Sequence, residues 1–490
     1  MNVLESAIAL LSPASAVKRA QAKHLLRAYE AAKPGTLRKQ SRDKRTPSAV
    51  ARAATAELRT QARNLDENHD IAKGVLNTLV CNIVGKGIQI EPLVKTNKGE
   101  LHDKVNQQLS ELWRDWCFSP EVTDEMSWSE VERMACRTWL RDGELFVKQL
   151  VGQRSDLNHI SKVPYSIELI EADYVPVGMH RPNTNAMDGI ERDDWGRAKL
   201  FWIAKRNNTD MLPGVDFVSV AASDMLHIKN TDRIRQNRGV SIFASVLTRL
   251  EDIKDYEESE RIAAKISASM AAVIKKGAPD FYTPETSGDP RKLRMQPGMI
   301  FDDLLPGESI EMMDSNRPNP NLETFRQGQL KAIAAGTSTG YSSISRSYDG
   351  SYSAQRQEMV ETSVLYGALR DYFIERFSRP IWRRFVQTAL VANLISGSDI
   401  DKTTIENADF RGPGLPWIDP AKEIKAATEA VQAGFKSRTQ IIRENGGNPQ
   451  DVRKLLVTER QQDNTDQLIL SSDYANESKK PSSGTGQTTG

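Results

Sequence analysis

The feature that most constrains the fold is a very long helical pattern over residues 354–395. At 1.5 Å per residue, such a helix would be roughly 60 Å long. Pro380 lies inside the pattern and predicts a kink, because proline cannot donate the backbone hydrogen bond that its position requires. The apolar positions of the pattern are Met359, Val360, Val364, Leu365, Leu369, Tyr372, Phe373, Phe377, Ile381, Trp382, Phe385 and Val386. A small globular domain has no room for such an element, so the chain is expected to be elongated or oligomeric.

The first half of the chain combines helical and strand patterns. Apolar residues have helical spacing over 49–84 and 101–116, and Ser127 with Glu130 has the form of a capping box. Between residues 142 and 230 the apolar period changes to two, which is typical of strands. The predicted strands cover 88–91, 145–147, 167–170, 200–203 and 225–228. Strands and helices do not alternate regularly, so we predict an α+β fold with an antiparallel component.

The second half is mainly helical around one β-rich excursion. Residues 240–270 have the pattern of a long helix whose middle is rich in Glu and Asp. The segments that follow are short β-like pieces over 272–321, a second helix over 322–335 and a Gly/Ser-rich loop over 336–353. Three further helices are predicted to begin after Asp419, Ser437 and Asn448, which are suitable capping residues.

Charge is spread unevenly, although the formal net charge is only +1. Residues 1–60 hold twelve Lys and Arg against four acids, about +8, which leaves about −7 for the rest. We predict a mobile basic arm over 1–55, either simply solvated or in contact with nucleic acid or an acidic partner. The small polar residues of 471–490 predict a disordered tail.

Several classes of protein are disfavoured. No apolar run approaches the roughly 18 residues that span a membrane, so no membrane partner is expected. The three cysteines form no CxxC pair, and no pair of histidines has the spacing of metal ligands, so no metal site is predicted.

One motif resembles a catalytic site. Gly336-Thr-Ser338-Thr-Gly340 fits the nucleophile elbow of serine hydrolases, but a helix is predicted before it and no histidine follows it. Walker A, GxGxxG and HExxH motifs do not occur. We therefore predict neither an enzyme nor a cofactor, and keep a hydrolase at Ser338 as a minor alternative.

Seven segments, in order, resemble the portal proteins of tailed bacteriophages, specifically the lambda-like portal family. They are RNLDENHDIAKGVLNTLVCNIVGKGIQI (63–90), RTWLRDGELFV (137–147), ELIEADYV (168–175), GIERDDWGRAKLFWI (189–203), MLHIKNTDRIRQNRGVS (225–241), PGMIFDDLLPGESIE (297–311) and LPWIDPAKEIKA (415–426). The resemblance covers nearly the whole chain. It departs at residues 351–354, where Ser-Tyr-Ser-Ala stands in place of the Asn-Tyr-Ser-Ser-like run expected of the family.

The resemblance implies an elongated subunit of a ring, typically of twelve copies, at one vertex of the virion capsid. Double-stranded DNA would pass through its axial channel during packaging and ejection. The implied partners are terminase, the major capsid and scaffold proteins and the head-tail connector proteins, with assembly in the host cytoplasm. The implied parts are a wing over 56–235, stem helices over 236–271 and 322–335, a clip over 272–321, a tunnel loop over 336–353, a long kinked wing helix over 354–397 and a helical crown over 398–470.

The same resemblance indicates candidate site residues. Arg346, Tyr348 and Arg356 are candidates for DNA contact at the tunnel loop; for the two arginines, an ion pair between subunits or simple solvent exposure is the alternative. The candidates for terminase docking in the clip are Asp302, Asp303, Glu308 and Glu311. An acidic stem and clip would suit a channel, because tight phosphate binding would stall sliding DNA. A non-portal protein that binds nucleic acid through its basic arm is the competing interpretation.

Overall fold

The computed structural model has an α+β fold, as predicted. It describes residues 44–153, 157, 159–181, 184–205, 216–268, 272–276, 308–312, 321–414 and 419–466. The chain divides into two units, Met1–Val50 and Ala51–Gly490. The tail predicted over 471–490 and the arm up to residue 43 lie outside the described residues. The arm was predicted to extend to residue 55, but helix α3 already begins at Pro47.

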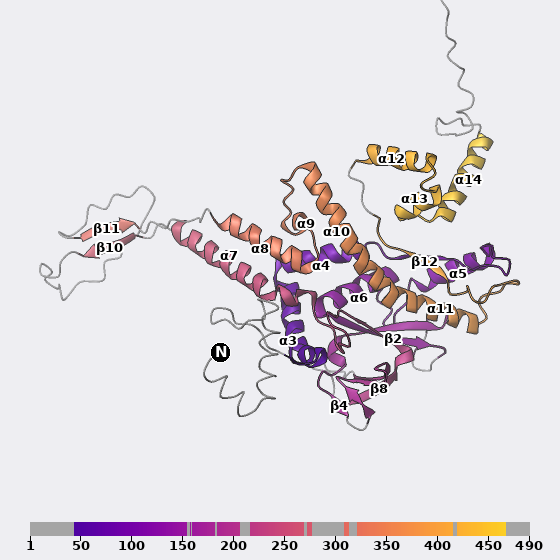
Figure 1. Ribbon diagram of the computed structural model, residues 1–490, viewed down its shortest axis with the longest axis horizontal. Helices are drawn as coiled ribbons and strands as arrows, with labels where there is room; N and C mark the ends of the chain where they lie inside the picture. Colours follow the sequence, from indigo (N-terminus) through magenta and orange to yellow (C-terminus); the bar gives the residue numbers. More distant parts are fainter. Residues whose placement is uncertain are drawn as a thin grey trace, which may run out of the picture. The chain divides into compact units, whose positions relative to one another are not determined.

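The helices and strands are labelled in Figure 1. The α-helices are α3 Pro47–Asn68, α4 Asp70–Ile83, α5 Asp103–Trp116, α6 Trp128–Asp142, α7 Leu247–Ala268, α8 Leu322–Thr337, α9 Tyr341–Ser345, α10 Tyr352–Phe373, α11 Arg379–Val391, α12 Pro420–Gln432, α13 Arg438–Glu444 and α14 Pro449–Asp466. The strands are β1 Gln89–Pro92, β2 Glu144–Val151, β3 Tyr165–Ile170, β4 His180–Arg181, β5 Ala186–Met187, β6 Ile190–Arg192, β7 Ala198–Ala204, β8 Phe217–Ala221, β9 Met225–Lys229, β10 Ala272–Lys276, β11 Glu308–Met312 and β12 Ala408–Arg411. Helices of 3-10 type cover Ala172–Tyr174, Ala222–Asp224 and Ile242–Ser245, and a π-helix covers Ile374–Ser378.

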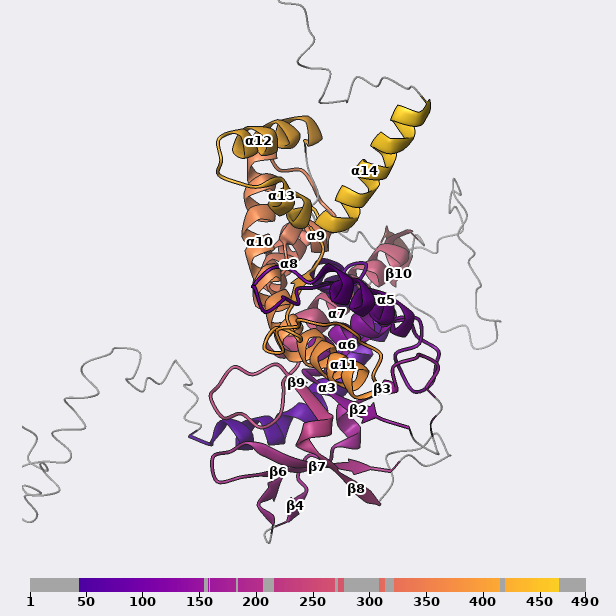
Figure 2. The same ribbon diagram turned by 90° about the vertical axis from the view of Figure 1, so that its right-hand side faces the viewer.

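The named strands of the described residues pair antiparallel throughout. One sheet has the order β3-β2-β9 and another runs β4-β5-β6-β7-β8, part of which is seen in Figure 2. The strands predicted between residues 142 and 230 are confirmed as β2, β3, β7 and β9. The strand predicted over 88–91 is confirmed as β1, and its partner is the distant β12. Strands β4, β5 and β6 escaped prediction because two or three residues are too few to show a period.

The helical pattern over 49–84 is broken into α3 and α4 at His69. The ring of His69 accepts a hydrogen bond from the backbone N–H of Ile71, which caps α4, and its other nitrogen lies 2.9 Å from the Leu250 carbonyl oxygen. The helical pattern is thus confirmed on both sides of His69, and the buried histidine holds the break between the two helices through a contact far away in the sequence.

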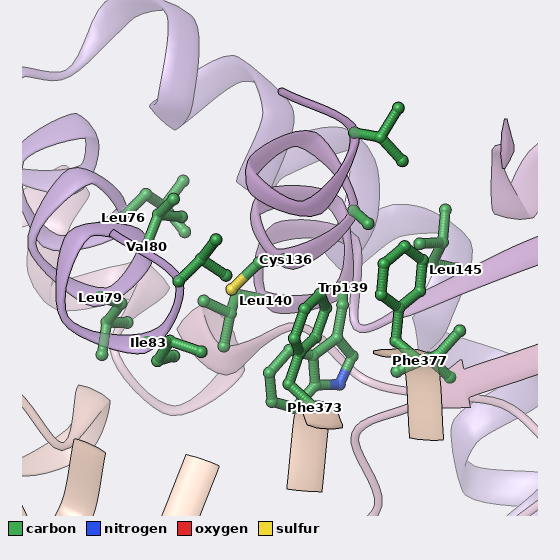
Figure 3. Packing of buried hydrophobic residues seen from close by; sticks show 14 of the residues in the cluster. Leu76, Leu79, Val80, Ile83, Cys136, Trp139, Leu140, Leu145, Phe373 and Phe377 are labelled. Carbon is green, nitrogen blue, oxygen red and sulfur yellow. The ribbon is translucent and has the colours of Figure 1, made fainter. Parts of the chain in front are cut away.

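The capping box is confirmed at the start of α6, where the Ser127 N–H donates to the Glu130 carboxylate at 2.8 Å. The apolar faces of α4, α6 and the segment formed by α10 and the π-helix meet in the main core. Figure 3 shows Trp139 beside Phe373, with Leu79 and Ile83 of α4 packed on the other side of α6. Trp139 and Phe373 stack with ring centroids 6.0 Å apart. Burial of these large side chains is the main stabilising contribution to the fold.

The long helical pattern that includes Pro380 begins at Tyr352 and ends at Val391, not at residues 354 and 395. It consists of α10, the π-helix and α11, and the backbone N–H of Arg379 bonds to the Ile374 carbonyl. Pro380 follows at the start of α11, where its missing N–H is tolerated. The irregularity caused by proline is thus taken up in the preceding π-helical turn.

Helix α7 begins at Leu247, seven residues later than its pattern suggested. The delay follows from a close approach of two glycines: a Cβ on Gly239 would lie 2.0 Å from the Gly143 carbonyl oxygen. Gly143 itself has φ +85°, a left-handed conformation that ends α6. The chain leaves this contact through the 3-10 turn Ile242–Ser245 before α7 can start.

The segment predicted as a loop over 336–353 is partly helical. Helix α8 extends to Thr337, α9 occupies Tyr341–Ser345, and α10 already begins at Tyr352. In the C-terminal region the three predicted helix starts are confirmed: Asp419 accepts from the Lys422 N–H, Ser437 from the Gln440 N–H and Asn448 from the Gln450 N–H. In the described part of the chain, no helix has the length and apolar character to cross a bilayer.

Candidate functional site

Helices α7 and α8 pack against each other (Figure 1). The rings of Tyr256 and Phe325 have centroids 4.9 Å apart. Arg326 Nε donates to Glu257 Oε1 at 2.6 Å. An aromatic contact and an ion pair therefore join the two helices.

The acidic residues of α7 lie mostly on its exposed side. The exposed acids are Glu251, Asp252, Asp255 and Glu258. The apolar residues Leu250 and Ile253 are buried, whereas Glu260 is the exception among the acids with 5% exposure. The excess of exposed acids is confined to residues 251–258, because the same helix also exposes four cations, Arg249, Lys254, Arg261 and Lys265.

The turn between α8 and α10 is held by side chains of α10. Glu358 accepts hydrogen bonds from both the backbone N–H (2.9 Å) and the hydroxyl of Ser342 in α9. The Tyr366 hydroxyl accepts from the Gly340 N–H at 3.4 Å. A Cβ on Gly340 would lie 2.8 Å from Glu358 Oε1, so a larger residue here would displace that carboxylate from its present position. The resulting turn has a defined conformation, which is a requirement for any side chain that it presents to a ligand.

The three residues predicted to contact DNA are all exposed at this turn and the start of α10. Arg346 ends α9 with φ +57°, Tyr348 is 59% exposed, and Arg356 Nη1 lies 3.3 Å from the Tyr352 hydroxyl. Gln355 donates to the carbonyl oxygens of Tyr348 and Gly350 and so holds the turn against the helix. No ion pair joins the two arginines to a described carboxylate, so their charges are open to solvent.

Ser338 does not have the setting of a hydrolase nucleophile. It follows helix α8, where a nucleophile elbow requires a strand, and it is the left-handed C-cap of that helix with φ +57°. The geometry at this serine therefore contradicts the alternative of an elbow.

Of the four acidic candidates in the β-rich excursion, the structure describes two. Asp302 and Asp303 lie outside the described residues. Glu308 and Glu311 belong to β11, which pairs with β10 in the register Lys276 to Glu308 and Val273 to Glu311. The backbone forms a β-hairpin stem, as the β-like pattern predicted, and the docking role of these acids remains a prediction.

A surface that the sequence analysis did not single out as a site is the exposed apolar face of α10. Val364 is 69% exposed, and Val360 and Leu365 are 48% and 44% exposed. These residues belong to the apolar stripe, but the stripe is wider than the face that packs on the core. The width of the stripe is visible in the sequence. An apolar stripe wider than one helix face indicates that some of its residues pack against something other than the core of the same chain.

The C-terminal helices have the same character. None of α12, α13 and α14 has a buried residue. Their exposed apolar side chains are Ile424, Leu455, Leu456 and Val457, and Phe435 between α12 and α13 is 85% exposed. A helix without a buried face gains little stability from packing within its own chain. The exposed apolar side chains of these three helices are therefore not covered by any other part of the single subunit.

A second feature missed by the sequence analysis is a network of buried and partly buried ion pairs that includes Glu144, the first residue of β2. Its members are Asp66, Arg137, Arg141, Asp142, Arg63, Asp173, Arg59, Glu144 and Arg238. Arg238 Nη2 lies 2.7 Å from Glu144 Oε1, and both side chains are almost completely buried. Burial alone would raise the pKa of Glu144, but the charge of Arg238 holds it well below its ordinary value. The network fastens α3, α6 and β2 together.

Glu132 of α6 is also buried, but unlike Glu144 it has a raised pKa. Its carboxyl group accepts from the Ile88 N–H at 2.8 Å and lies 3.2 Å from the Ser378 hydroxyl. It forms no ion pair with a described cation, and burial raises its pKa to about 8.

Comparison with known proteins gives the family. The model of the lambda family of phage portal proteins matches residues 33–370, well over half of the chain. This chain belongs to that family. The resemblance noted in the sequence is thereby confirmed, and the family is a structural one rather than a family of enzymes.

The portal family includes relatives from several phages. The chain is 21% identical over 413 residues to the probable portal protein of Halomonas phage phiHAP-1, an alignment that covers 81% of this chain and 78% of that protein. It is 22% identical to portal protein B of Escherichia phage lambda, with 53% of this chain and 52% of that protein covered.

Solved structures with a similar chain come from gene transfer agent particles. A chain in the neck of a native particle, computed with C12 symmetry, has a TM-score of 0.41 and 13% identity, and the match covers 82% of this chain and all of that chain. A chain from the virion of a native particle has a TM-score of 0.45 and 12% identity over 82% and 99% of the two chains.

Proposed function

We propose that this portal protein assembles into a ring, with twelve subunits as the expected number, at one vertex of a phage capsid. DNA passes through the axial channel of the ring during packaging and ejection. The observation that carries the proposal is the pair of apolar surfaces, on α10 and on α12–α14, that the single chain leaves uncovered. In a ring, each subunit covers such surfaces on its neighbour, and family membership supports this arrangement.

The proposed channel is lined in part by α7 and by the turn before α10. The exposed acids of α7 repel the DNA backbone, while Arg346 and Arg356 supply a small number of positive contacts. Each neutralised phosphate adds salt-dependent affinity, so few contacts let DNA slide. Tyr348, which is exposed between them, offers an aromatic surface at the same place.

The proposed docking element for terminase, and later for head-tail connector proteins, is the region of the β10–β11 hairpin. Its acids Glu308 and Glu311, together with Asp302 and Asp303, would supply the charged contacts. The ring would sit in the virion among the major capsid and scaffold proteins, after assembly in the host cytoplasm.

Mass measurement of the purified chain tests the ring. The expected particle has a mass of about 660 kDa, twelve times the 54.7 kDa of one chain, and shows a central hole in negative-stain images. A compact monomer at all concentrations and salts would refute the proposal. Removing residues 1–43, a deletion that stops before α3, should leave assembly intact, because the proposed apolar interface lies on α10 and α12–α14; loss of all DNA affinity in that variant would instead favour the basic-arm interpretation.

A further inference from the structure

A cavity of about 650 Å³ opens between the β4–β6 strands, β9 and the segment after β9. Its wall contains the basic side chains His180, Arg181, Arg192, Lys229 and Arg235. The acids in its wall are Asp193 and Asp194. Basic groups therefore outnumber acids in a hollow large enough for a small ligand.

Two of these cations are partly withdrawn from water and are hydrogen-bonded only to uncharged groups. Arg192 Nη1 donates to the Gly196 carbonyl at 2.8 Å, while its Nε is buried without an acceptor. Lys229 Nζ donates to the carbonyl oxygens of Gln236 and Asn237. Burial, followed by the charge of Arg192, lowers the pKa of Lys229 to about 8. The two like charges thus stand close together and neither pairs with a described carboxylate.

Two neighbouring carboxylates, those of Asp193 and Asp188, are bonded to other groups. Asp193 Oδ1 accepts from the backbone N–H groups of Trp195 and Arg197, at 3.0 and 2.7 Å. Asp188, the carboxylate whose charge acts on Arg192, lies 2.6 Å from Arg52 Nε and pairs with it. Neither Arg192 nor Lys229 therefore forms an ion pair with Asp188 or Asp193, whose carboxylates have these other partners.

An aromatic side chain stands at the same cavity. Trp195 belongs to its wall and is 79% exposed, which is unusual for a tryptophan. Arg181 lies over the Trp202 ring at 3.8 Å, so its guanidinium group is held in a defined orientation. An oriented cation and an exposed indole are the groups that bind a phosphate attached to a planar base.

We propose that this cavity binds a phosphate group, through Arg192 and Lys229 with Arg181 as a further contact. A phosphate places a negative charge between the two like charges of Arg192 and Lys229 and offers acceptor oxygens to the guanidinium and ammonium groups. The volume exceeds that of one phosphate, so the group can be free or part of a nucleotide chain whose base stacks on Trp195. The site is separate from the turn that carries Arg346 and does not depend on the proposed channel.

Isothermal titration of the assembled full-length protein in low-chloride buffer tests the site. The probes are inorganic pyrophosphate and a 5′-phosphorylated dinucleotide, with the unphosphorylated nucleoside as the reference. The double variant Arg192→Gln, Lys229→Gln is expected to bind both phosphates at least about tenfold more weakly, because two charge-assisted hydrogen bonds are lost. Lys199→Gln, an exposed change on β7 outside the cavity wall, should bind as the wild type does.

The substitution Trp195→Ala separates the two sources of phosphate. If the natural ligand is part of a nucleic acid, the dinucleotide binds more tightly than pyrophosphate and loses this advantage in the variant. If it is free phosphate, the variant changes neither affinity.

The proposal is overturned if the wild type shows no saturable binding of either phosphate, or if the double variant binds as tightly as the wild type. Circular dichroism and particle mass verify that the variants fold and assemble. If the double variant does not, Arg181→Gln takes its place: it removes a partly exposed cation, and unchanged affinity for both phosphates in that variant overturns the proposal.

Discussion

Ser378, the last residue of the π-helical turn, donates a hydrogen bond of 3.2 Å to the buried carboxyl group of Glu132. The other oxygen of that group accepts from the Ile88 N–H at the entrance to β1. One side chain thus connects α6, the first strand and the irregular turn of the long helix. Since it has no counter-ion among the described residues, the connection depends on its protonation state.

Glu132 predicts an unusual pH dependence of stability. Its pKa rises from 4.5 in the unfolded chain to about 8 in the folded protein, so between these values the folded protein holds a proton that the unfolded chain releases. The free energy of unfolding therefore decreases as pH rises through this window, by up to about 1.4 kcal/mol per pH unit. Glu132→Gln keeps the group neutral, and thermal melting should show the variant to be more stable than wild type at pH 9 and similar to it near pH 4.5.

The matched control for this experiment is Glu125→Gln, an exposed change a few residues away. It should leave the pH dependence of melting unchanged. A wild type and a Glu132→Gln variant whose melting curves shift in parallel between pH 5 and 9 would contradict the assignment of a neutral Glu132.

Glu144 predicts a large loss of stability on neutralisation. Glu144→Gln leaves the guanidinium group of Arg238 buried without a counter-charge, a change that costs about 3–5 kcal/mol. The control is Glu168→Gln, which breaks the partly exposed pair between Glu168 of β3 and Lys148 of β2 and should cost no more than about 1 kcal/mol. Chemical unfolding measures both, and equal losses would show that burial of the first pair has no energetic consequence.

Two glycines in different surroundings, Gly239 and Gly74, predict opposite effects of the same substitution. Gly239→Ala places a methyl group 2.0 Å from the Gly143 carbonyl oxygen, so the backbone must move and the yield of folded protein should fall sharply. Gly74→Ala in α4 meets no atom within 4 Å and should stabilise the protein by about 0.5–1 kcal/mol through higher helix propensity. Melting temperatures of the two variants give the comparison, and similar values would argue against the close contact.

The exposed face of α10 predicts a variant that folds but does not assemble. Val364→Asp puts a charge on a side chain that is 69% exposed in the single subunit, so it should leave the melting of the subunit nearly unchanged. If a neighbouring subunit covers this face, burial of the unpaired charge should shift the mass distribution from rings to monomers. Met134→Asp, an equivalent change on α6, should assemble normally, and rings of normal mass in Val364→Asp would exclude this face from the interface.

Sequence reasoning performed best where the deciding contacts are local. The capping box of Ser127 and Glu130 and the caps at Asp419 and Ser437 involve hydrogen bonds between residues three positions apart, so the sequence of a few residues is enough to predict them. Arg346 and Arg356 are exposed, which agrees both with the predicted DNA contact and with its alternative of simple solvent exposure. Their proposed contact with DNA depends on the family resemblance and not on the local pattern.

Other features depend on contacts between distant segments. The break at His69 is held by the Leu250 carbonyl, and the late start of α7 follows from the approach of Gly239 to Gly143. The Glu144–Arg238 pair joins residues 94 positions apart. No period or local motif encodes such partners, because each exists only after the chain has brought two elements together.

The sequence alone therefore determined the type of most elements, their capped ends and the family, since these are written in local hydrogen bonds, apolar periods and runs of residues. Only the tertiary structure decided which residues of the long apolar stripe are covered and which charges are buried. Packing selects one face of each helix for the core, and the remaining apolar face and the charges without counter-ions become visible only when that selection has been made.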